Sequence, residues 1–428
     1  MDDVSPSAVK SSRRVPTAIP QPSVHTERAR RAGRLADGVL RPVLLGMLGM
    51  VVLIATARPA AATELGSLAA AMAPGTWAQL TTKNVGAVSL LFTLGPGYDD
   101  SSMFWNSKKR VIGHMIVEHS AGSSCPNACY RGLVTYDDET NTWTTGGPRP
   151  PQSVTYHNYD HVAFDDVNEV LYVRYSNSRQ VHRYCYNNTP AWCAGRQNTW
   201  SPLPLAPTGF TQIAGAITYH STMDGGSLLF FTGDAFGVNH GALAQFREST
   251  GTWTVIGGAG QAFTNGDYHN LAEYSPVKQV AIFGGGNGSN RLWKITANKT
   301  ITPLTNAPFS ITLGAGNRSA IADPVSGNFI FIFGIGPGQG QLWELNPDGA
   351  GTWTRLDASL TGAGEICEDF FDTGAGCSGD LHGAAIPTYG VIMYWQITGS
   401  TAGRVWLYKH APSQPLSPPA APTSLTAK

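Results

Sequence analysis

Five short segments of this chain combine side chains that can bind a ligand or a metal ion. They read Tyr98-Asp-Asp-Ser-Ser102, Tyr156-His-Asn-Tyr-Asp-His161, Gly266-Asp-Tyr-His-Asn270, Gly316-Asn-Arg-Ser319 and Gly379-Asp-Leu-His382. Carboxylate and guanidinium groups form directional hydrogen bonds, while tyrosine rings offer an apolar face to a sugar ring or a side chain. The predicted contact residues are His157, Tyr159, Asp160, His161, Asp267, Tyr268, His269, Asn270, Arg318, Asp380 and His382.

The same segments admit other interpretations. Imidazole is a good copper ligand, and tyrosine directly precedes histidine at Tyr156-His157, Tyr219-His220 and Tyr268-His269. A structural interpretation is that these polar groups bond neighbouring strands and line a water-filled channel. The carboxylates of Asp160 and Asp267 would suit glycoside hydrolysis if the fold held them at the right separation.

Signatures of other enzyme classes are missing from the sequence. It contains no Gly-x-Ser-x-Gly elbow, and no phosphate or dinucleotide loop in a strand-to-helix context. Acidic residues are dense at Glu365, Glu368, Asp369, Asp372 and Asp380. Such oxygen ligands can hold calcium, but the EF-hand spacing is absent, so a solvated acidic loop is favoured. We predict no catalytic residue, no metal and no cofactor, with copper and calcium as alternatives.

The elements that position these segments follow a repeat of about fifty residues. The stretch Leu133-Val-Thr-Tyr-Asp-Asp-Glu-Thr-Asn-Thr-Trp143 returns in weaker copies that end in Asn-Thr-Trp200, Gly-Thr-Trp253 and Gly-Thr-Trp353, and Gly-Thr-Trp77 stands alone near the start. Short apolar runs and turns at this period are typical of four-stranded sheets arranged around an axis. The tryptophans are expected to pack between these sheets. The 49 glycines and 28 prolines suit the many turns of an all-β fold.

Six repeats are counted from the apolar second strand of each sheet and the third strand that follows it. Second strands are predicted at 111–117, 170–175, 228–231, 280–283, 329–333 and 391–395, and third strands at 131–136, 181–186, 242–246, 292–295, 342–345 and 405–408. The sixth repeat lacks an outer strand, which Thr76-Trp-Ala-Gln-Leu80 is predicted to supply. A ring closed in this way leaves no open sheet edge. A seventh repeat is the alternative, if 85–94 contains a degenerate copy.

Particular residues of the repeat carry a family resemblance. Tyr136-Asp-Asp-Glu-Thr-Asn-Thr-Trp143, the Gly-Gly pair after an apolar strand, and Pro148-Arg-Pro-Pro151 resemble kelch repeats. The resemblance covers roughly residues 75–410 and is weaker in the second and sixth repeats. It implies a kelch-type β-propeller that is similar to the central domain of galactose oxidase. Relatives of this kind include both binding scaffolds and copper-radical oxidases, and the fold does not choose between them.

Cysteine spacing favours the scaffold. Galactose oxidase-like enzymes crosslink a cysteine to a ligand tyrosine. The six cysteines here instead form three close pairs: Cys125 with Cys129, Cys185 with Cys193, and Cys367 with Cys377. Such spacing predicts local disulfides made in an oxidising compartment. We therefore predict an exported scaffold that binds an extracellular glycan or protein. A copper-radical oxidase, or a glycan-active enzyme using the same residues, is the alternative.

Composition divides the chain into three regions. Residues 1–62 contain an Arg-rich stretch, an apolar run from Val43 to Ala57, and small residues up to Ala62. This layout predicts a secretory signal, with a retained N-terminal anchor as the alternative. Residues 63–411 are predicted to form the propeller and 412–428 a Pro-rich tail. The 29 basic and 29 acidic residues cancel, so no nucleic-acid partner is expected, and a membrane contact is expected only if the N-terminal segment is retained.

Overall fold

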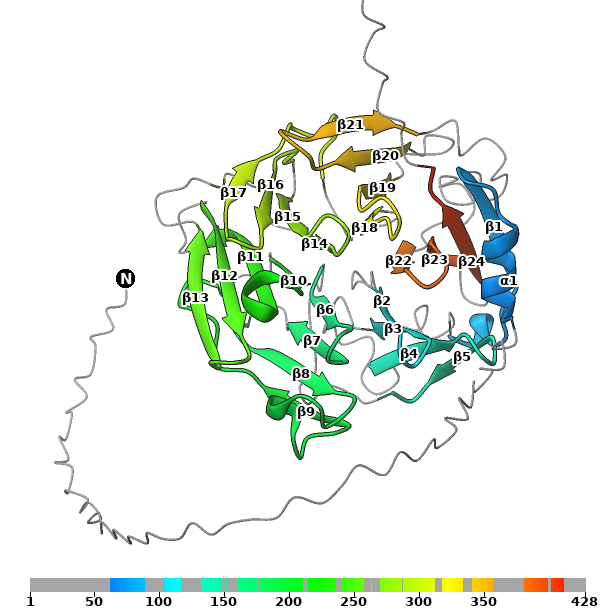
Figure 1. Ribbon diagram of the computed structural model, residues 1–428, viewed down its shortest axis with the longest axis horizontal. Coiled ribbons are helices and arrows are strands. Elements are labelled where there is room, and N and C mark those ends of the chain that lie inside the picture. The colour runs from blue at the N-terminus through cyan, green and yellow to red at the C-terminus, as the bar shows by residue number, and fades with distance from the viewer. Residues whose placement is uncertain are drawn as a thin grey trace, which may run out of the picture. The chain divides into compact units, whose positions relative to one another are not determined.

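The strands of the protein form six four-stranded antiparallel sheets, as seen in a computed structural model of the chain. The structure describes residues 62–88, 103–116, 132–147, 151, 160–174, 178–210, 215–235, 240–257, 263, 270–286, 288–311, 318–333, 341–356, 381–398 and 402–411. All described elements belong to one unit, residues 59–428. Figure 1 shows the sheets radiating around a common axis.

We number the sheets as blades one to six, in the order of their inner strands. Blade one contains β2 (Met103–Asn106), β3 (Val111–Ile116), β4 (Gly132–Asp137) and β5 (Thr142–Thr145). Blade two contains β6 (Val162–Asp165), β7 (Val170–Arg174), β8 (Val181–Cys185) and β9 (Thr199–Pro202). Blade three contains β10 (Ala216–His220), β11 (Ser227–Ala235), β12 (His240–Arg247) and β13 (Thr252–Gly257). Blade four contains β14 (Asn270–Ser275), β15 (Val280–Gly285), β16 (Leu292–Thr296) and β17 (Ile301–Pro303). Blade five contains β18 (Arg318–Ala322), β19 (Phe329–Phe333), β20 (Gln341–Asn346) and β21 (Thr352–Arg355). Blade six contains β22 (Leu381–Ile386), β23 (Val391–Thr398), β24 (Ala402–Lys409) and β1 (Thr76–Leu80). Short helices include α1 (Glu64–Ala71), η1 (Ala191–Cys193) and η2 (Met223–Gly225).

The chain is a six-bladed β-propeller. Every predicted second and third strand coincides with a strand of the structure, because alternation of buried apolar runs with turns is a local property of the sequence. A degenerate seventh repeat was the alternative for residues 85–94. Within that stretch, residues 85–88 are helical, and residues 89–94 lie outside the described residues. Within the described residues, no helix has both the length and the apolar character that a membrane crossing requires.

The sixth blade contains a strand from the other end of the chain. Strand β1 pairs with β24 in antiparallel register, with Thr76 opposite Lys409. The Trp77 ring stacks on Tyr408 at a centroid distance of 4.5 Å. Helix α1 lies beside this sheet in Figure 1, and Lys409 Nζ donates a hydrogen bond of 3.0 Å to the carbonyl oxygen of Ala69 near its end.

Tryptophans of the repeat connect neighbouring blades, as predicted. In three blades the indole N–H donates to the segment that follows the outer strand of the preceding blade: Trp143 to Thr82, Trp253 to Pro204 and Trp353 to Thr305. The Trp143 side chain is 1% exposed and its ring lies 4.6 Å from that of Trp395 in blade six. An indole thus fills the space between two sheets and satisfies its one donor there.

The glycines at the end of β15 have a structural explanation. Gly284, Gly285 and Gly286 have φ angles of 137°, 67° and 107°, a region that disfavours side chains. A Cβ atom on Gly284 would lie 2.5 Å from the carbonyl oxygen of Arg291. These glycines are required by the backbone of the turn, without any ligand.

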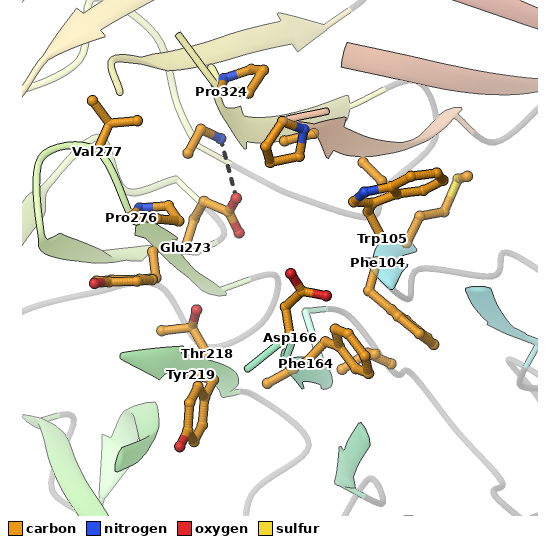
Figure 2. A pocket seen from close by; sticks show the side chains of 18 residues that line it. Phe104, Trp105, Phe164, Asp166, Thr218, Tyr219, Glu273, Pro276, Val277 and Pro324 are labelled. Carbon is orange, nitrogen blue, oxygen red and sulfur yellow. Dashed lines mark hydrogen bonds between the residues drawn. The ribbon is translucent and has the colours of Figure 1, made fainter. Parts of the chain in front are cut away.

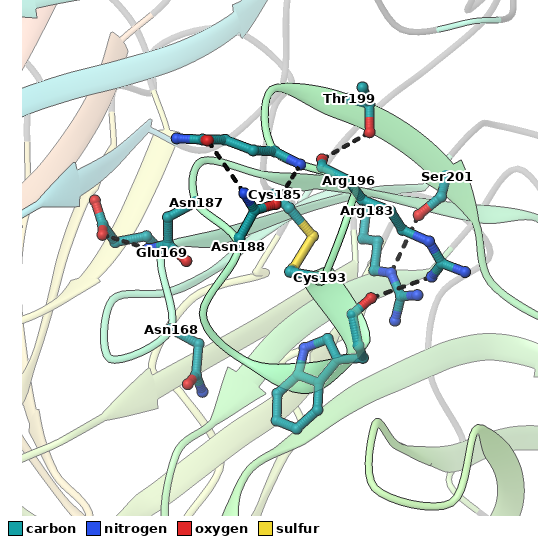
Figure 3. The surroundings of a disulfide bond; sticks show 12 residues. Asn168, Glu169, Arg183, Cys185, Asn187, Asn188, Cys193, Arg196, Thr199 and Ser201 are labelled. Atoms are coloured by element: carbon teal, nitrogen blue, oxygen red, sulfur yellow. Dashed lines mark hydrogen bonds between the residues drawn. A yellow bond between two sulfur atoms is a disulfide. The ribbon is translucent and has the colours of Figure 1, made fainter.

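One of the three predicted disulfides lies in the described residues. Cys185, at the end of β8, is bonded to Cys193 in η1, with their Cα atoms 5.8 Å apart (Figure 3). The same loop is bonded across its base, because Gln197 N donates to Asn188 Oδ1 at 3.1 Å.

The cysteines of the other two predicted disulfides fall in stretches that the structure does not describe. Cys125 and Cys129 belong to the connection between β3 and β4, and both lie outside the described residues. Cys367 and Cys377 belong to the connection between β21 and β22, and they also lie outside the described residues. Bonds from Cys125 to Cys129 and from Cys367 to Cys377 therefore stay predictions, and only the Cys185 pair is confirmed.

Candidate functional site

The described members of the predicted contact set lie where the chain enters the inner strands. Asp160 and His161 precede β6, Asn270 begins β14, Arg318 begins β18, and His382 is the second residue of β22. The blades repeat one strand order around the axis, so these ends share one face, which we call the entry face. His157, Tyr159, Asp267, Tyr268, His269, Asp380 and the side chain of Arg318 lie outside the described residues. Ligand contact by the set stays a prediction.

Asp160 connects three blades. Its carboxylate Oδ2 accepts a 2.7 Å hydrogen bond from Ala272 N in blade four. Its own carbonyl oxygen accepts one of 2.8 Å from Ile217 N in blade three. Asp160 is 6% exposed. A buried carboxylate that accepts backbone N–H groups holds the start of β6 in place beside the axis.

Asn270 and His161 are also bonded inside the propeller. Asn270 Oδ1 accepts from Gly233 N in blade three at 3.1 Å, and its Nδ2 donates to Gly285 O at 3.2 Å. Arg174 Nη1 donates to His161 Nε2 at 2.6 Å, and the guanidinium lies 4.5 Å from the centre of the Phe230 ring. Burial lowers the pKa of Arg174 to about 9. These hydrogen bonds hold the residues of the entry face in position from inside the blades.

Two histidines meet between blades one and six. The rings of His114 on β3 and His382 on β22 lie 4.3 Å apart, and both side chains are buried. Burial, and secondarily the neighbouring His382, lowers the pKa of His114 well below its usual value. Neutral imidazoles can bind a metal. Across the described ranges, however, no group of three or more His, Cys, Asp or Glu side chains is placed to hold an ion.

Of the three Tyr-His pairs considered as copper ligands, one is fully described. Tyr219 stacks on Tyr172 of blade two, with ring centroids 5.7 Å apart. His220 packs instead on Tyr274 of blade four, at 4.4 Å. Adjacent side chains of a strand point to opposite faces, so Tyr219 and His220 are not placed to bind one ion.

A cavity of about 260 Å³ lies on the axis at the other ends of the inner strands. Each inner strand contributes to its wall: Phe104, Phe164, Thr218, Glu273, Ala322 and Ala385. Its mouth is formed in the turns that follow the inner strands, where Pro276, Val277 and Pro387 are exposed. We call this space the axial cavity (Figure 2). Neither Asp160 nor Asn270 lines it, because strands enter at one end and leave at the other.

Glu273 is one of two carboxylates that line the axial cavity. Its Oε1 accepts a 3.1 Å hydrogen bond from Ala322 N in blade five. Figure 2 shows the carboxylate reaching from β14 into the cavity. Burial, followed by the nearby charge of Asp160, raises the pKa of Glu273 to about 8, while the Ala322 N–H opposes this rise. Desolvation disfavours the charged carboxylate, so Glu273 is mostly protonated at neutral pH.

Asp166 is the second carboxylate of the cavity, and both of its oxygens already accept hydrogen bonds from the protein itself. Its Oδ1 accepts from Ser107 N at 2.8 Å and its Oδ2 from Ser107 Oγ at 2.6 Å. These bonds connect the turn after β6 to the turn after β2, and thereby shape the mouth. Both carboxylates were missed by the sequence reasoning. The signal for Glu273 was a carboxylate inside the otherwise apolar strand Leu271-Ala-Glu-Tyr274.

No protein-family model matches this chain, and no curated protein matches it either. Several solved structures resemble it. A fungal alcohol oxidase in complex with copper is 10% identical, with 73% of this chain and 74% of that chain covered and a TM-score of 0.38. Regucalcin, a calcium-binding protein from Agrobacterium tumefaciens, is 10% identical over 74% of this chain and 92% of its own, with a TM-score of 0.41. A streptogramin B lyase is 13% identical over 74% and 96%, with a TM-score of 0.39. Likeness at this level carries no information about activity.

The propeller therefore presents two places where chemistry can occur. The entry face carries polar residues that are bonded into the blades, among them Asp160 and Asn270. The axial cavity carries aromatic walls and one carboxyl group with a raised pKa, Glu273. Groups with perturbed pKa values in clefts mark candidate functional sites.

Proposed function

We propose that this protein is an exported kelch-type propeller whose entry face binds an extracellular glycan or protein. The proposed contacts are the members of the predicted set whose side chains lie outside the described residues, with Tyr159 and Tyr268 stacking on the ligand and Arg318 as the cationic group. The buried members of the set, Asp160, His161, Asn270 and His382, support these contacts from inside the blades. The observation that supports this role is the bonding of Asp160, in front of blade two, to blades three and four. Buried bonds directly beneath the entry segments give variable loops a rigid support, which is how propellers carry binding sites.

Export is part of the same proposal. The Arg-rich and apolar residues 1–62 would act as a secretory signal that is cleaved after Ala62, which leaves helix α1 and strand β1 on the sixth blade. The Cys185–Cys193 disulfide agrees with an oxidising compartment. Fractionation of the native host, followed by N-terminal sequencing, tests this step. A cytoplasmic chain with an intact N-terminus would contradict it.

The binding role is tested with the full-length chain on a glycan array and against immobilised extracellular proteins. Tyr268→Ala and Arg318→Ala should reduce binding at least about tenfold, the usual scale for truncating a contact residue at a hot spot, without lowering the melting temperature. Tyr268→Phe keeps the ring and should retain most of the binding. Arg196→Ala removes an exposed arginine in the loop of blade two and is the matched control. If both test variants unfold instead, the polar residues of the entry face have a structural role.

A copper measurement separates this proposal from catalysis by the same residues. Tyr156-His157 and Tyr268-His269 keep the residue types of a copper site. The full-length chain is offered copper and calcium, and its metal content is then measured. About one copper per chain, together with release of peroxide from alcohols or sugars, would replace the scaffold by an oxidase. Absence of bound copper supports the scaffold.

A further inference from the structure

The walls of the axial cavity have a composition that suits a cation. Phe104, Trp105, Phe164 and Tyr219 contribute aromatic surface, and most of the remaining wall is aliphatic. The described residues that line the cavity include two carboxylates, but no lysine, arginine or histidine. Aromatic faces attract cations, and more strongly where water is excluded.

The position of Glu273 adds a direct partner for an N–H donor. One carboxylate oxygen is bonded to Ala322 N. The side chain is only partly accessible to solvent and lines the cavity. Its second oxygen is thus available to a molecule inside the cavity, and a charge-assisted hydrogen bond in such a place is stronger than a neutral one.

We propose that the axial cavity binds an organic cation: a primary ammonium group on a small aromatic or aliphatic body. The ammonium group donates to Glu273, and the body packs against Phe104 and Phe164, whose rings are stacked at 4.5 Å. The cavity of about 260 Å³ lies just below the lower end of the usual range for small-molecule sites. It therefore selects a small amine.

The wall does not suit a metal ion. Calcium requires six to eight oxygen ligands, whereas the cavity offers Glu273 and an Asp166 carboxylate that already accepts two bonds from Ser107. An ammonium group carried on an apolar body makes use of the aromatic wall, and a small hard metal ion does not.

Binding of this ligand has a proton signature. At neutral pH Glu273 holds a proton, and the ammonium ligand arrives charged. Formation of the ion pair requires the Glu273 carboxyl to lose that proton to solvent. The negative carboxylate then balances the positive charge of the ammonium group. The groups that face Glu273 are the Asp160 carboxylate, the Ala322 N–H, and, around the cavity, Asp166, Tyr219 and Tyr274. Of these, Asp160 disfavours ionisation and the Ala322 N–H favours it.

Calorimetry with the full-length chain tests the proposal. 2-Phenylethylammonium is titrated near neutral pH in two buffers of different ionisation enthalpy, with 2-phenylethanol as the uncharged control of equal shape. We expect the amine to bind at least about tenfold more tightly than the alcohol, with release of about one proton per molecule. Glu273→Gln keeps an acceptor for Ala322 N, and should abolish both the preference and the proton release.

Two further variants complete the design. Glu139→Gln makes the same chemical change at a side chain that is 70% exposed and away from the cavity, and should leave amine binding unchanged. Phe164→Leu keeps an apolar wall without the ring and should weaken amine binding about threefold, the scale of one cation–π contact.

Equal binding of amine and alcohol, or amine binding and proton release that survive in Glu273→Gln, would overturn the proposal. The axial cavity and the entry face lie at opposite ends of the inner strands. Loss of glycan or protein binding in Tyr268→Ala would therefore leave the calorimetric result unaffected, and the two proposals can fail separately.

Discussion

The carboxylate of Asp160 accepts a hydrogen bond from the backbone amide of Ala272 at 2.7 Å, across the centre of the propeller. A side chain in front of blade two is thereby bonded to the inner strand of blade four. The same residue accepts a bond from blade three through its carbonyl oxygen. Residues far apart in the sequence are thus held together at the entry face.

Asp160→Ala should lower the free energy of unfolding by about 1–3 kcal/mol, because a buried N–H group at Ala272 loses its acceptor. Asp160→Asn keeps an acceptor oxygen and should cost less. Urea unfolding followed by tryptophan fluorescence measures both values. Equal costs for the two variants would show that the charge, and not the hydrogen bond, is what matters.

Trp77→Ala should destabilise the protein by about 2–4 kcal/mol, the cost of truncating a large packed aromatic side chain. Trp77 stacks on Tyr408 and also lies 5.5 Å from the ring of Tyr394, so it holds β1 on the sixth blade. Gln79→Ala, at an exposed position on the same strand, is the control. Chemical denaturation of both variants compares them, and a Trp77→Ala variant as stable as Gln79→Ala would contradict a structural role for β1.

Glu273 predicts a pH dependence of stability. The pKa of its carboxyl is about 8 in the folded protein and is raised from 4.5, so the folded state retains a proton that the unfolded state has lost. The free energy of unfolding therefore falls as pH rises from about 4.5 to about 8 and this contribution is constant outside that window. Glu273→Gln removes it. In urea titrations, the free energy of unfolding of the variant relative to that of the parent should increase between about pH 5 and about pH 8. A difference between the two proteins that does not change with pH would be incompatible with a raised pKa.

Loss of the Cys185–Cys193 bond should cost about 2–3 kcal/mol, the chain-entropy value for a short loop. The double variant Cys185→Ala, Cys193→Ala is compared with the parent by thermal and urea unfolding under non-reducing conditions. Reductant should have a smaller effect on the variant than on the parent. An unchanged stability of the variant would mean that hydrogen bonds such as Gln197 N to Asn188 Oδ1 suffice to hold the loop.

The fold was largely predictable because its signals are local. A strand such as Phe329–Phe333 is recognised from its apolar run, and a turn such as Gly284–Gly286 from its glycines, without knowledge of any partner. Lengths were less predictable. Strand β11 was expected at 228–231 and extends over Ser227–Ala235, because hydrogen bonding to β12 continues past a register shift beyond Thr232.

The candidate site was predictable only in part. Polar residue types at the start of the inner strands identified Asp160 and Asn270 as unusual. Their partners are backbone groups, the amides of Ala272 and Gly233, and a backbone amide carries no residue-specific signal in a sequence. Whether a polar side chain faces a ligand or a neighbouring blade therefore cannot be derived from its type.

By itself, the sequence indicated six blades with seven as the alternative, the packing of the repeat tryptophans and the Cys185–Cys193 pair. Each depends on spacing along the chain, which short-range sterics and burial convert directly into structure. The tertiary structure alone decided that six inner strands enclose the axial cavity and that Glu273 lies inside it. The dielectric around a carboxyl group depends on every blade that surrounds it. The raised pKa of Glu273 therefore depends on the assembled ring and cannot be derived from a single repeat.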